Sequence, residues 1–165
     1  MGQSALIFFK ELVVVMNLKT KIPPPLVTIA FGILIYYSTE IIPSVTFTFQ
    51  GLLGALFLIA GLGVMISAIL TFRRLQTTIN PLQPNTASSL ASTGVFKLSR
   101  NPMYLAMLLI LIALALYTGA VASIFLLPGF IIYISVFQIV PEEQAMQELF
   151  SQAYADYCKQ VRRWI

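Results

Sequence analysis

Residues Tyr104–Val140 read YLAMLLILIALALYTGAVASIFLLPGFIIYISVFQIV and contain no charged side chain. This run is longer than the roughly 20 residues that one helix needs to cross a bilayer. A Tyr-Thr-Gly step ending at Gly119 divides it, and such a step is typical of a turn. The run therefore predicts a hairpin of two membrane-spanning helices, over residues 102–117 and 120–140.

Two more apolar stretches lie on the N-terminal side of this hairpin. Residues 26–42 follow a run of three prolines, and residues 50–72 carry several glycines and alanines. Small residues let another helix approach closely, so the second stretch would also permit a homo-oligomer. Residues 4–18 are interrupted by Lys10 and Glu11, which predicts a helix lying in the membrane interface; a fifth span is the alternative.

The composition also indicates a membrane protein. Of the 165 residues, 58% are hydrophobic and 10% are charged, and the mean hydropathy is +0.88. A soluble domain carries about 25% charged residues. The absence of histidine and the single cysteine, Cys158, exclude an internal disulfide and argue against a metal site.

The basic residues follow membrane topology. All ten would lie on one side of a four-helix arrangement, namely Lys10, Lys19, Lys21, Arg73, Arg74, Lys97, Arg100, Lys159, Arg162 and Arg163. Cytoplasmic loops carry an excess of such residues, so we expect both termini in the cytoplasm, as in a multi-pass protein of a bacterial inner membrane. Because topology accounts for the net charge of +4, we expect no nucleic-acid partner.

The remaining segments are more polar. Residues 73–101 form a connection long enough to suggest a functional or disordered cytoplasmic loop. Residues 142–163 have the periodicity of an amphipathic helix, and Arg162, Arg163 and Trp164 resemble an interfacial anchor. The sequence therefore predicts an all-α fold in a single domain, 1–165: a multi-pass transmembrane helical bundle of four spans, with an N-terminal interfacial helix and a C-terminal amphipathic helix.

Both ends of the hairpin return to one membrane surface, so residues 100–104 should lie near Glu142 and Glu143. The structural interpretation is that Ser99 caps a helix and that the two acids suit a helix N-terminus. The functional interpretation is that the acids bind a cation or hydroxyl groups at the membrane surface. The residues alone leave both open.

The stretches TGVF at 93–96 and SRNPMY at 99–104 resemble the central motif of the isoprenylcysteine carboxyl methyltransferase family, whose wider group includes phospholipid N-methyltransferases. Members carry an Arg-His-Pro or Arg-Asn-Pro step followed by Tyr. A Glu-Glu pair then follows, here at 142–143, and a Tyr-x-x-Tyr in the tail, here at 154–157. The resemblance runs from about Phe72 to the C-terminus and includes Thr77, Thr78 and Pro81.

The resemblance implies a methyltransferase that uses S-adenosylmethionine and acts on a lipidic or membrane-associated acceptor. It implies reaction roles for Glu142, Glu143 and Arg100. Carried over by position, the cofactor-binding residues would be Ser89, Leu90, Phe96, Asn101, Pro102, Met103, Tyr104 and Glu143. The chemistry needs neither a metal nor a histidine, because the protein mainly aligns donor and acceptor and excludes water.

Three positions depart from the family pattern. Asn101 stands where the isoprenylcysteine enzymes have His, and the glycine of the tail is replaced near Ser151. Residues 138–141 lack the Arg that would contact a carboxylate, which argues against a carboxylate acceptor. Two other functions remain as alternatives. One is a related membrane reductase with a nicotinamide cofactor, for which the loop offers few basic residues; the other is a non-catalytic membrane scaffold.

Overall fold

A computed structural model describes residues 22–75 and 89–165 of the chain. The predicted N-terminal helix and the middle of the 73–101 loop, with Thr77, Thr78 and Pro81, lie outside these residues. The described part is helical and contains no strand, which confirms the all-α prediction. Its elements are α2 (Pro24–Ser38), α3 (Gln50–Leu75), the 3-10 turn η2 (Gly94–Lys97), α4 (Pro102–Thr118), α5 (Ser123–Ile134), the π-helical turn η3 (Ser135–Ile139) and α6 (Val140–Gln160).

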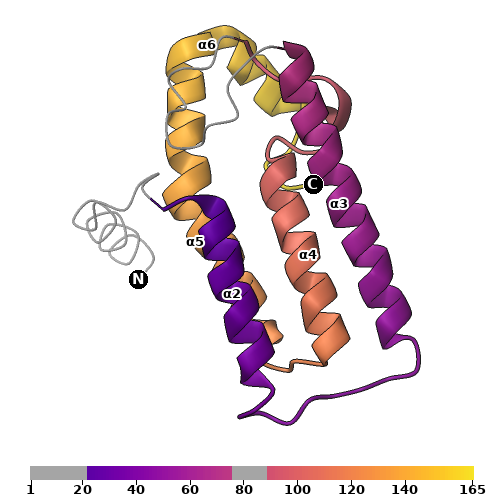
Figure 1. Ribbon diagram of the computed structural model, residues 1–165. Coiled ribbons are helices and arrows are strands. Elements are labelled where there is room, and N and C mark those ends of the chain that lie inside the picture. The colour runs from indigo at the N-terminus through magenta and orange to yellow at the C-terminus, as the bar shows by residue number, and fades with distance from the viewer. Residues whose placement is uncertain (1–21, 76–88) are drawn as a thin grey trace, which may run out of the picture.

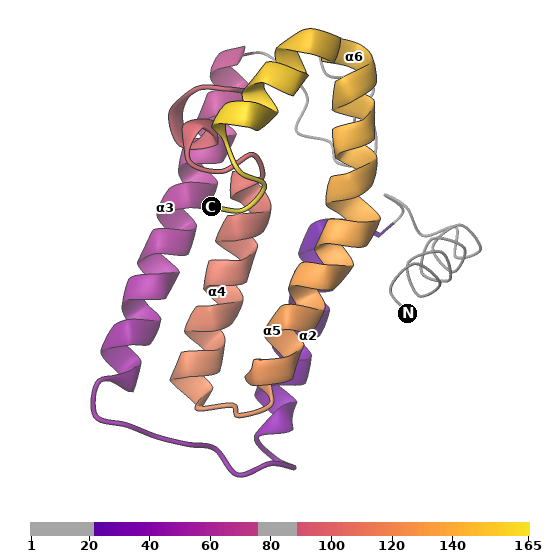
Figure 2. The same cartoon turned by 180° about the vertical axis from the view of Figure 1, so that it is seen from behind.

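Helix α4 is the centre of the bundle. It packs against α3 on one side and against α2 and α5 on the other, as Figures 1 and 2 show from opposite directions. Phe31 of α2 and Phe130 of α5 meet edge to face, with ring centroids 5.6 Å apart. Helices α2, α3, α4 and α5 therefore form one bundle, and α6 extends from one end of it.

The contact between α3 and α4 depends on two glycines. A Cβ added at Gly54 would lie 3.2 Å from the carbonyl oxygen of Ala113, and one at Gly61 would lie 3.1 Å from that of Ala106. Glycine at these positions, seven residues apart on α3, lets the two backbones approach. Two of the glycines in the stretch over 50–72 thus serve a helix contact within the chain, whereas a Cβ at Gly51 or Gly63 would meet nothing within 4 Å.

The far end of the bundle closes at the predicted turn. Gly119 ends α4 with a φ of 66°, a left-handed conformation that glycine adopts without strain. Its carbonyl accepts a hydrogen bond from the Val45 amide at 2.9 Å. The Gln50 side chain donates to the Tyr117 carbonyl at 3.1 Å, which ties the start of α3 to the end of α4. The hairpin turn is where the sequence places it.

The chain does not change direction at the expected boundary between the last span, over 120–140, and the C-terminal helix, over 142–163. Helix α6 begins at Val140, next to that boundary, but the helical turns run on without a break from α5 through η3 into α6. Proline lacks an N–H and its ring clashes with the carbonyl four residues earlier. Here the π turn η3 precedes it, with the Val140 amide bonded to the Ser135 carbonyl, and a widened turn relieves this conflict.

The direction of the chain changes instead at Ser151. Its backbone has φ 42° and ψ −109°, which interrupts the helical geometry inside α6. Beyond this bend, visible at the top of Figure 1, Tyr154, Tyr157 and Val161 turn back and pack with Leu90. A positive φ favours glycine, so serine at this position holds a strained backbone.

We expect Ser151→Gly to stabilise the protein. Relief of the left-handed strain outweighs the added entropy of the unfolded chain by about 0.5–1 kcal/mol. Gln144→Gly, at an exposed site in the regular part of α6, should destabilise by about 1 kcal/mol. Thermal unfolding in detergent measures both variants, and a lower melting temperature for Ser151→Gly would contradict the expectation.

Two helices are long and apolar enough to cross a membrane. They are Gln50–Leu75 and Ser123–Gln160, and only 17% and 22% of their most apolar windows are buried within the protein. Helices α2 and α4 are apolar but shorter, so the number of spans does not follow from length alone. Large apolar side chains of α3, such as Leu56, Ile59 and Ile66, are exposed. A surface of this kind requires an apolar solvent, so the protein is membrane-associated.

Candidate active site

The Arg-Asn-Pro step and the acidic pair meet at one end of the bundle. The segment before α4 carries Arg100, and the first turn of α6 carries Glu143. Nη2 of Arg100 lies 3.2 Å from Oε1 of Glu143, and both side chains are largely buried. The proximity predicted from the hairpin topology is confirmed.

A second guanidinium holds the same carboxylate. Arg163 Nε lies 3.0 Å from Oε1 of Glu143, and Nη2 lies 2.6 Å from Oε2. Such a two-bond pair fixes the carboxylate in orientation as well as in position. Hydrogen bonding to Glu143 raises the pKa of the Arg163 guanidinium above its ordinary value, although burial opposes part of this effect. Glu143 is therefore an anion clamped between two permanent cations.

Glu142 has a different environment. Its carboxylate accepts a hydrogen bond from the Tyr104 hydroxyl, which reaches it from the first turn of α4. Within residues 22–75 and 89–165, no Lys or Arg forms an ion pair with Glu142. Two neighbours in sequence thus differ in their electrostatic environment: Glu143 forms ion pairs with two guanidinium groups, whereas burial raises the pKa of the Glu142 carboxyl to about 7.

The C-terminal tail completes this end of the bundle. The Arg100 amide donates to the Arg162 carbonyl at 3.0 Å, and Asn101 Nδ2 donates to the Arg163 carbonyl at 2.9 Å. Trp164 packs against the main hydrophobic core. The interpretation of residues 162–164 as an interfacial anchor is therefore wrong for Arg163 and Trp164, because the tail turns back into the protein beside the start of α4, as Figure 2 shows.

Arg100 links the acidic pair to the second half of α6. Its Nη1 lies 3.5 Å from the Tyr154 hydroxyl and also contacts Sγ of Cys158. Its Nε is buried and has no hydrogen-bond partner among the described residues. Nearby, the Tyr157 hydroxyl donates to the Phe96 carbonyl at 2.6 Å. The bend at Ser151 brings all of these α6 side chains to the loop.

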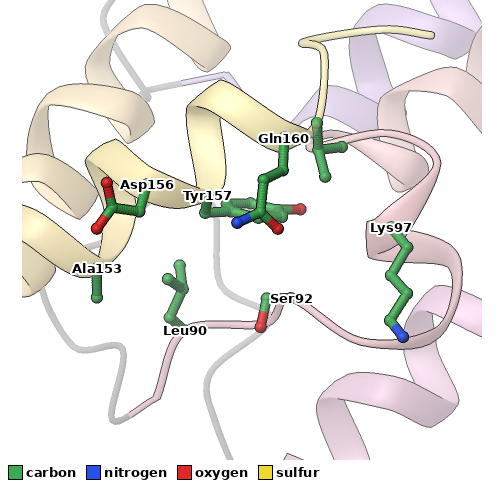
Figure 3. A pocket seen from close by; sticks show the side chains of 8 residues that line it. Leu90, Ser92, Lys97, Ala153, Asp156, Tyr157 and Gln160 are labelled. Carbon is green, nitrogen blue, oxygen red and sulfur yellow. The ribbon is translucent and has the colours of Figure 1, made fainter.

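A groove lies beside this network, between the loop and the second half of α6. Its volume is about 530 Å³, with Asp156 toward one end and Lys97 toward the other (Figure 3). The lining residues are Leu90, Ser92, Lys97, Ala153, Asp156, Tyr157, Gln160 and Val161. A volume of several hundred Å³ suits a small-molecule ligand.

Six of the ten residues predicted from the sequence lie at the candidate site. Arg100, Asn101 and Glu143 belong to one hydrogen-bonded network, Tyr104 and Glu142 form a pair beside it, and Leu90 lines the groove. The other four are placed as follows: Ser89 donates to the Leu75 carbonyl at 3.3 Å, the Phe96 ring packs edge to face on Phe72, buried Pro102 opens α4, and Met103 follows it half-buried.

Sequence analysis gave no role at the site to three members of the network, Arg163, Tyr154 and Cys158. Arg163 lies next to a tryptophan and carries no signal in the sequence that separates it from Arg162. Its contact with Glu143 appears only when the tail folds back. Among the described residues, no group of three or more His, Cys, Asp or Glu side chains could hold a metal ion.

Comparison with known proteins identifies the family. A family model described as phospholipid methyltransferase matches residues 49–153, more than half of the chain. No curated protein and no solved structure matches significantly. The matched segment begins with α3 and includes the Arg-Asn-Pro step, the hairpin and the acidic pair, whereas Tyr154, Cys158 and Arg163 lie beyond it. The chain belongs to the phospholipid methyltransferase family.

Proposed function

We propose that the protein transfers a methyl group from S-adenosylmethionine to a lipidic or membrane-associated acceptor at the cytoplasmic membrane face. The observation that carries the proposal is the junction of Arg100 and Tyr104 with Glu143 and Glu142 inside the segment that matches the family. A methyltransferase of this family needs one pocket shared by a donor and an acceptor. These residues converge where α4 and α6 begin.

The side chains present fit S-adenosylmethionine in two respects. Glu142 offers a carboxylate without a counter-ion among the described residues, which suits the positive charge of a sulfonium or an ammonium group. The groove beside Leu90 and Tyr157 offers half-apolar walls and a volume typical of small-ligand sites. Asn101, Tyr104 and Glu142 would hold the charged part of the cofactor, and the groove would take its apolar part.

The chain's own residues would then act by positioning and electrostatics. S-adenosylmethionine supplies an already activated methyl group when bound. Arg100 and Arg163 fix Glu143, and this fixes the first turn of α6 relative to α4. Glu142, with Tyr104 as its hydrogen-bond partner, is the carboxylate available to balance positive charge or to accept a proton from the acceptor. Alignment and exclusion of water can lower the barrier by several kcal/mol.

We also propose that the bundle crosses the membrane four times, with the site on the cytoplasmic side, as in a bacterial inner membrane. Helices α2 and α4 have 15 and 17 residues, or about 22–26 Å of helix, close to the thickness of a thin bilayer core. All seven Lys and Arg of the described residues lie at the site end: Arg73, Arg74, Lys97, Arg100, Lys159, Arg162 and Arg163. The positive-inside rule assigns that end to the cytoplasm.

A transfer assay tests the function. Purified protein in lipid vesicles, given S-adenosylmethionine with a labelled methyl group, should move label into the lipid extract of host membranes. Because the acceptor is expected to enter from the bilayer, a short-chain, water-soluble analogue should react at least about 10-fold more slowly. Equal rates for both acceptors would refute access from the bilayer.

The same preparation separates the alternatives. Calorimetric titration with S-adenosylmethionine should give binding, and titration with NADPH should give none. Binding of NADPH alone would support the reductase, and binding of neither ligand would support a scaffold without catalysis. Family membership supports the methyltransferase over both.

A further inference from the structure

We propose that Arg163 is a positioning residue of the methyl-transfer site, and that the C-terminal tail carries it there to hold Glu143. This inference rests on the proposed function and adds a residue outside the segment that matches the family. Arg163 contacts neither Tyr104 nor Glu142 through a hydrogen bond or ion pair found among the described residues, so it would act through Glu143.

The first step of the argument is the geometry of the clamp. Arg100 provides one contact to Glu143, at 3.2 Å, through a single Nη atom. Arg163 provides two, at 3.0 and 2.6 Å, to the two separate oxygens. A single contact leaves the carboxylate free to rotate about its own axis, whereas two parallel contacts define its plane. The orientation of Glu143 is therefore set by Arg163.

The second step concerns what holds Arg163. Its carbonyl accepts hydrogen bonds from Asn101 Nδ2 at 2.9 Å and from Ser99 Oγ at 3.4 Å. The carbonyl of Arg162 accepts a third bond, from the Arg100 amide at 3.0 Å. Trp164, the next residue, packs on the main core. The backbone of Arg162 and Arg163 is thus bonded to the residues just before α4. These bonds fix the point from which the Arg163 side chain reaches Glu143.

The third step follows from the position of Glu143 in the chain. It adjoins Glu142, and both lie in the first turn of α6. When Arg163 fixes Glu143, it also restrains the turn that presents the Glu142 carboxylate to Tyr104. The tail also bonds to Asn101, just before α4. One segment therefore aligns the start of α4 with the first turn of α6. Asn101 has a role here that the histidine of related enzymes need not share: it anchors the tail.

The neighbouring arginine provides a matched control. Arg162 has the same charge and lies one residue earlier in the chain, but its side chain is exposed and forms no ion pair within the described residues. We expect Arg163→Ala to lower kcat/KM for methyl transfer about 10-fold or more, because a small misplacement of a positioned group is costly. Arg162→Ala should stay within about twofold of the wild type.

Chemical rescue distinguishes positioning from a general loss of structure. Added guanidinium ion should restore part of the activity of Arg163→Ala, since it can occupy the vacated place beside Glu143. It should not restore the double variant Arg163→Ala/Glu143→Gln, which lacks the carboxylate, and the same concentration of urea should restore neither. Equal activity of Arg163→Ala and Arg162→Ala, or loss of activity without specific rescue, would overturn the positioning role.

Two further comparisons keep the outcome unambiguous. If Arg163→Ala does not purify as a folded protein, Arg163→Lys is compared with Arg162→Lys. Lysine keeps the charge but cannot form the two-bond pair, so only Arg163→Lys should lose activity, and equal activities would overturn the proposal. If the wild type itself transfers no methyl group, the proposed function fails as well. Activity of the wild type with no loss in the Arg163 variants would remove the positioning role alone.

Discussion

Glu143→Gln should abolish methyl transfer, with kcat/KM reduced at least about 100-fold, or about 2.7 kcal/mol in transition-state free energy. The substitution keeps the size of the side chain and removes its charge. Arg100 and Arg163 then lose their common partner in a site where the Glu143 side chain is only 17% exposed. Two neighbouring cations would repel each other and displace both the loop before α4 and the tail.

The expected effect on stability is smaller and can be measured separately. Loss of one partner from a fully buried pair costs about 3–5 kcal/mol, and the partial exposure of Arg163 reduces this to about 2 kcal/mol. Glu148→Gln is the matched control, because Glu148 is an exposed acid of the same helix with no ion pair among the described residues. If Glu143→Gln kept half of the wild-type activity, the clamp would have no part in the reaction.

Gly61→Val should have the largest effect on the fold. A Cβ at this position would lie 3.1 Å from the Ala106 carbonyl oxygen, 3.1 Å from Ile110 Cγ1 and 3.2 Å from Leu109 Cβ. Valine adds two more carbons at this contact, and α4 cannot move aside because α2 and α5 pack on its other face. Overpacking of this kind costs about 1–3 kcal/mol or more.

The control for this prediction is two residues away. A Cβ at Gly63 would meet nothing within 4 Å, so Gly63→Val changes the helix propensity of α3 by the same amount without a clash. Thermal unfolding can be followed through the fluorescence of the single tryptophan, Trp164, which packs on the core. A melting temperature for Gly61→Val equal to that of Gly63→Val would show that α3 and α4 are not in close contact in the membrane.

These two predictions concern one connected unit. Helix α4 receives the glycine face of α3 along its length, and the residues before its first turn carry Arg100 and Asn101. A displacement of α4 by valine at Gly61 would therefore also move Arg100 relative to Glu143. We expect Gly61→Val to lose activity together with stability, whereas Glu143→Gln loses activity in a protein that still folds.

The sequence determined the class of the fold and the meeting of the Arg-Asn-Pro step with the acidic pair. An uncharged run with one glycine near its middle can satisfy its backbone in lipid only as two helices joined by a turn, and the turn lies at Gly119 as predicted. The proximity of Arg100 to Glu143 follows from the same run, because a hairpin returns to the surface from which it started. Both conclusions depend on connectivity and hydropathy, which are properties of the chain itself.

Only the tertiary structure decided how the site is held. Whether Pro141 ends a helix depends on the π turn before it, and the backbone at Ser151 redirects α6 without any glycine to mark the place. The path of the tail over the start of α4 decides that Arg163, and not Arg162, contacts Glu143. These contacts join residues that are 20 to 64 positions apart, so no local propensity or periodicity encodes them. They are fixed by packing, which favours one of several arrangements that the same pattern of apolar and charged residues allows.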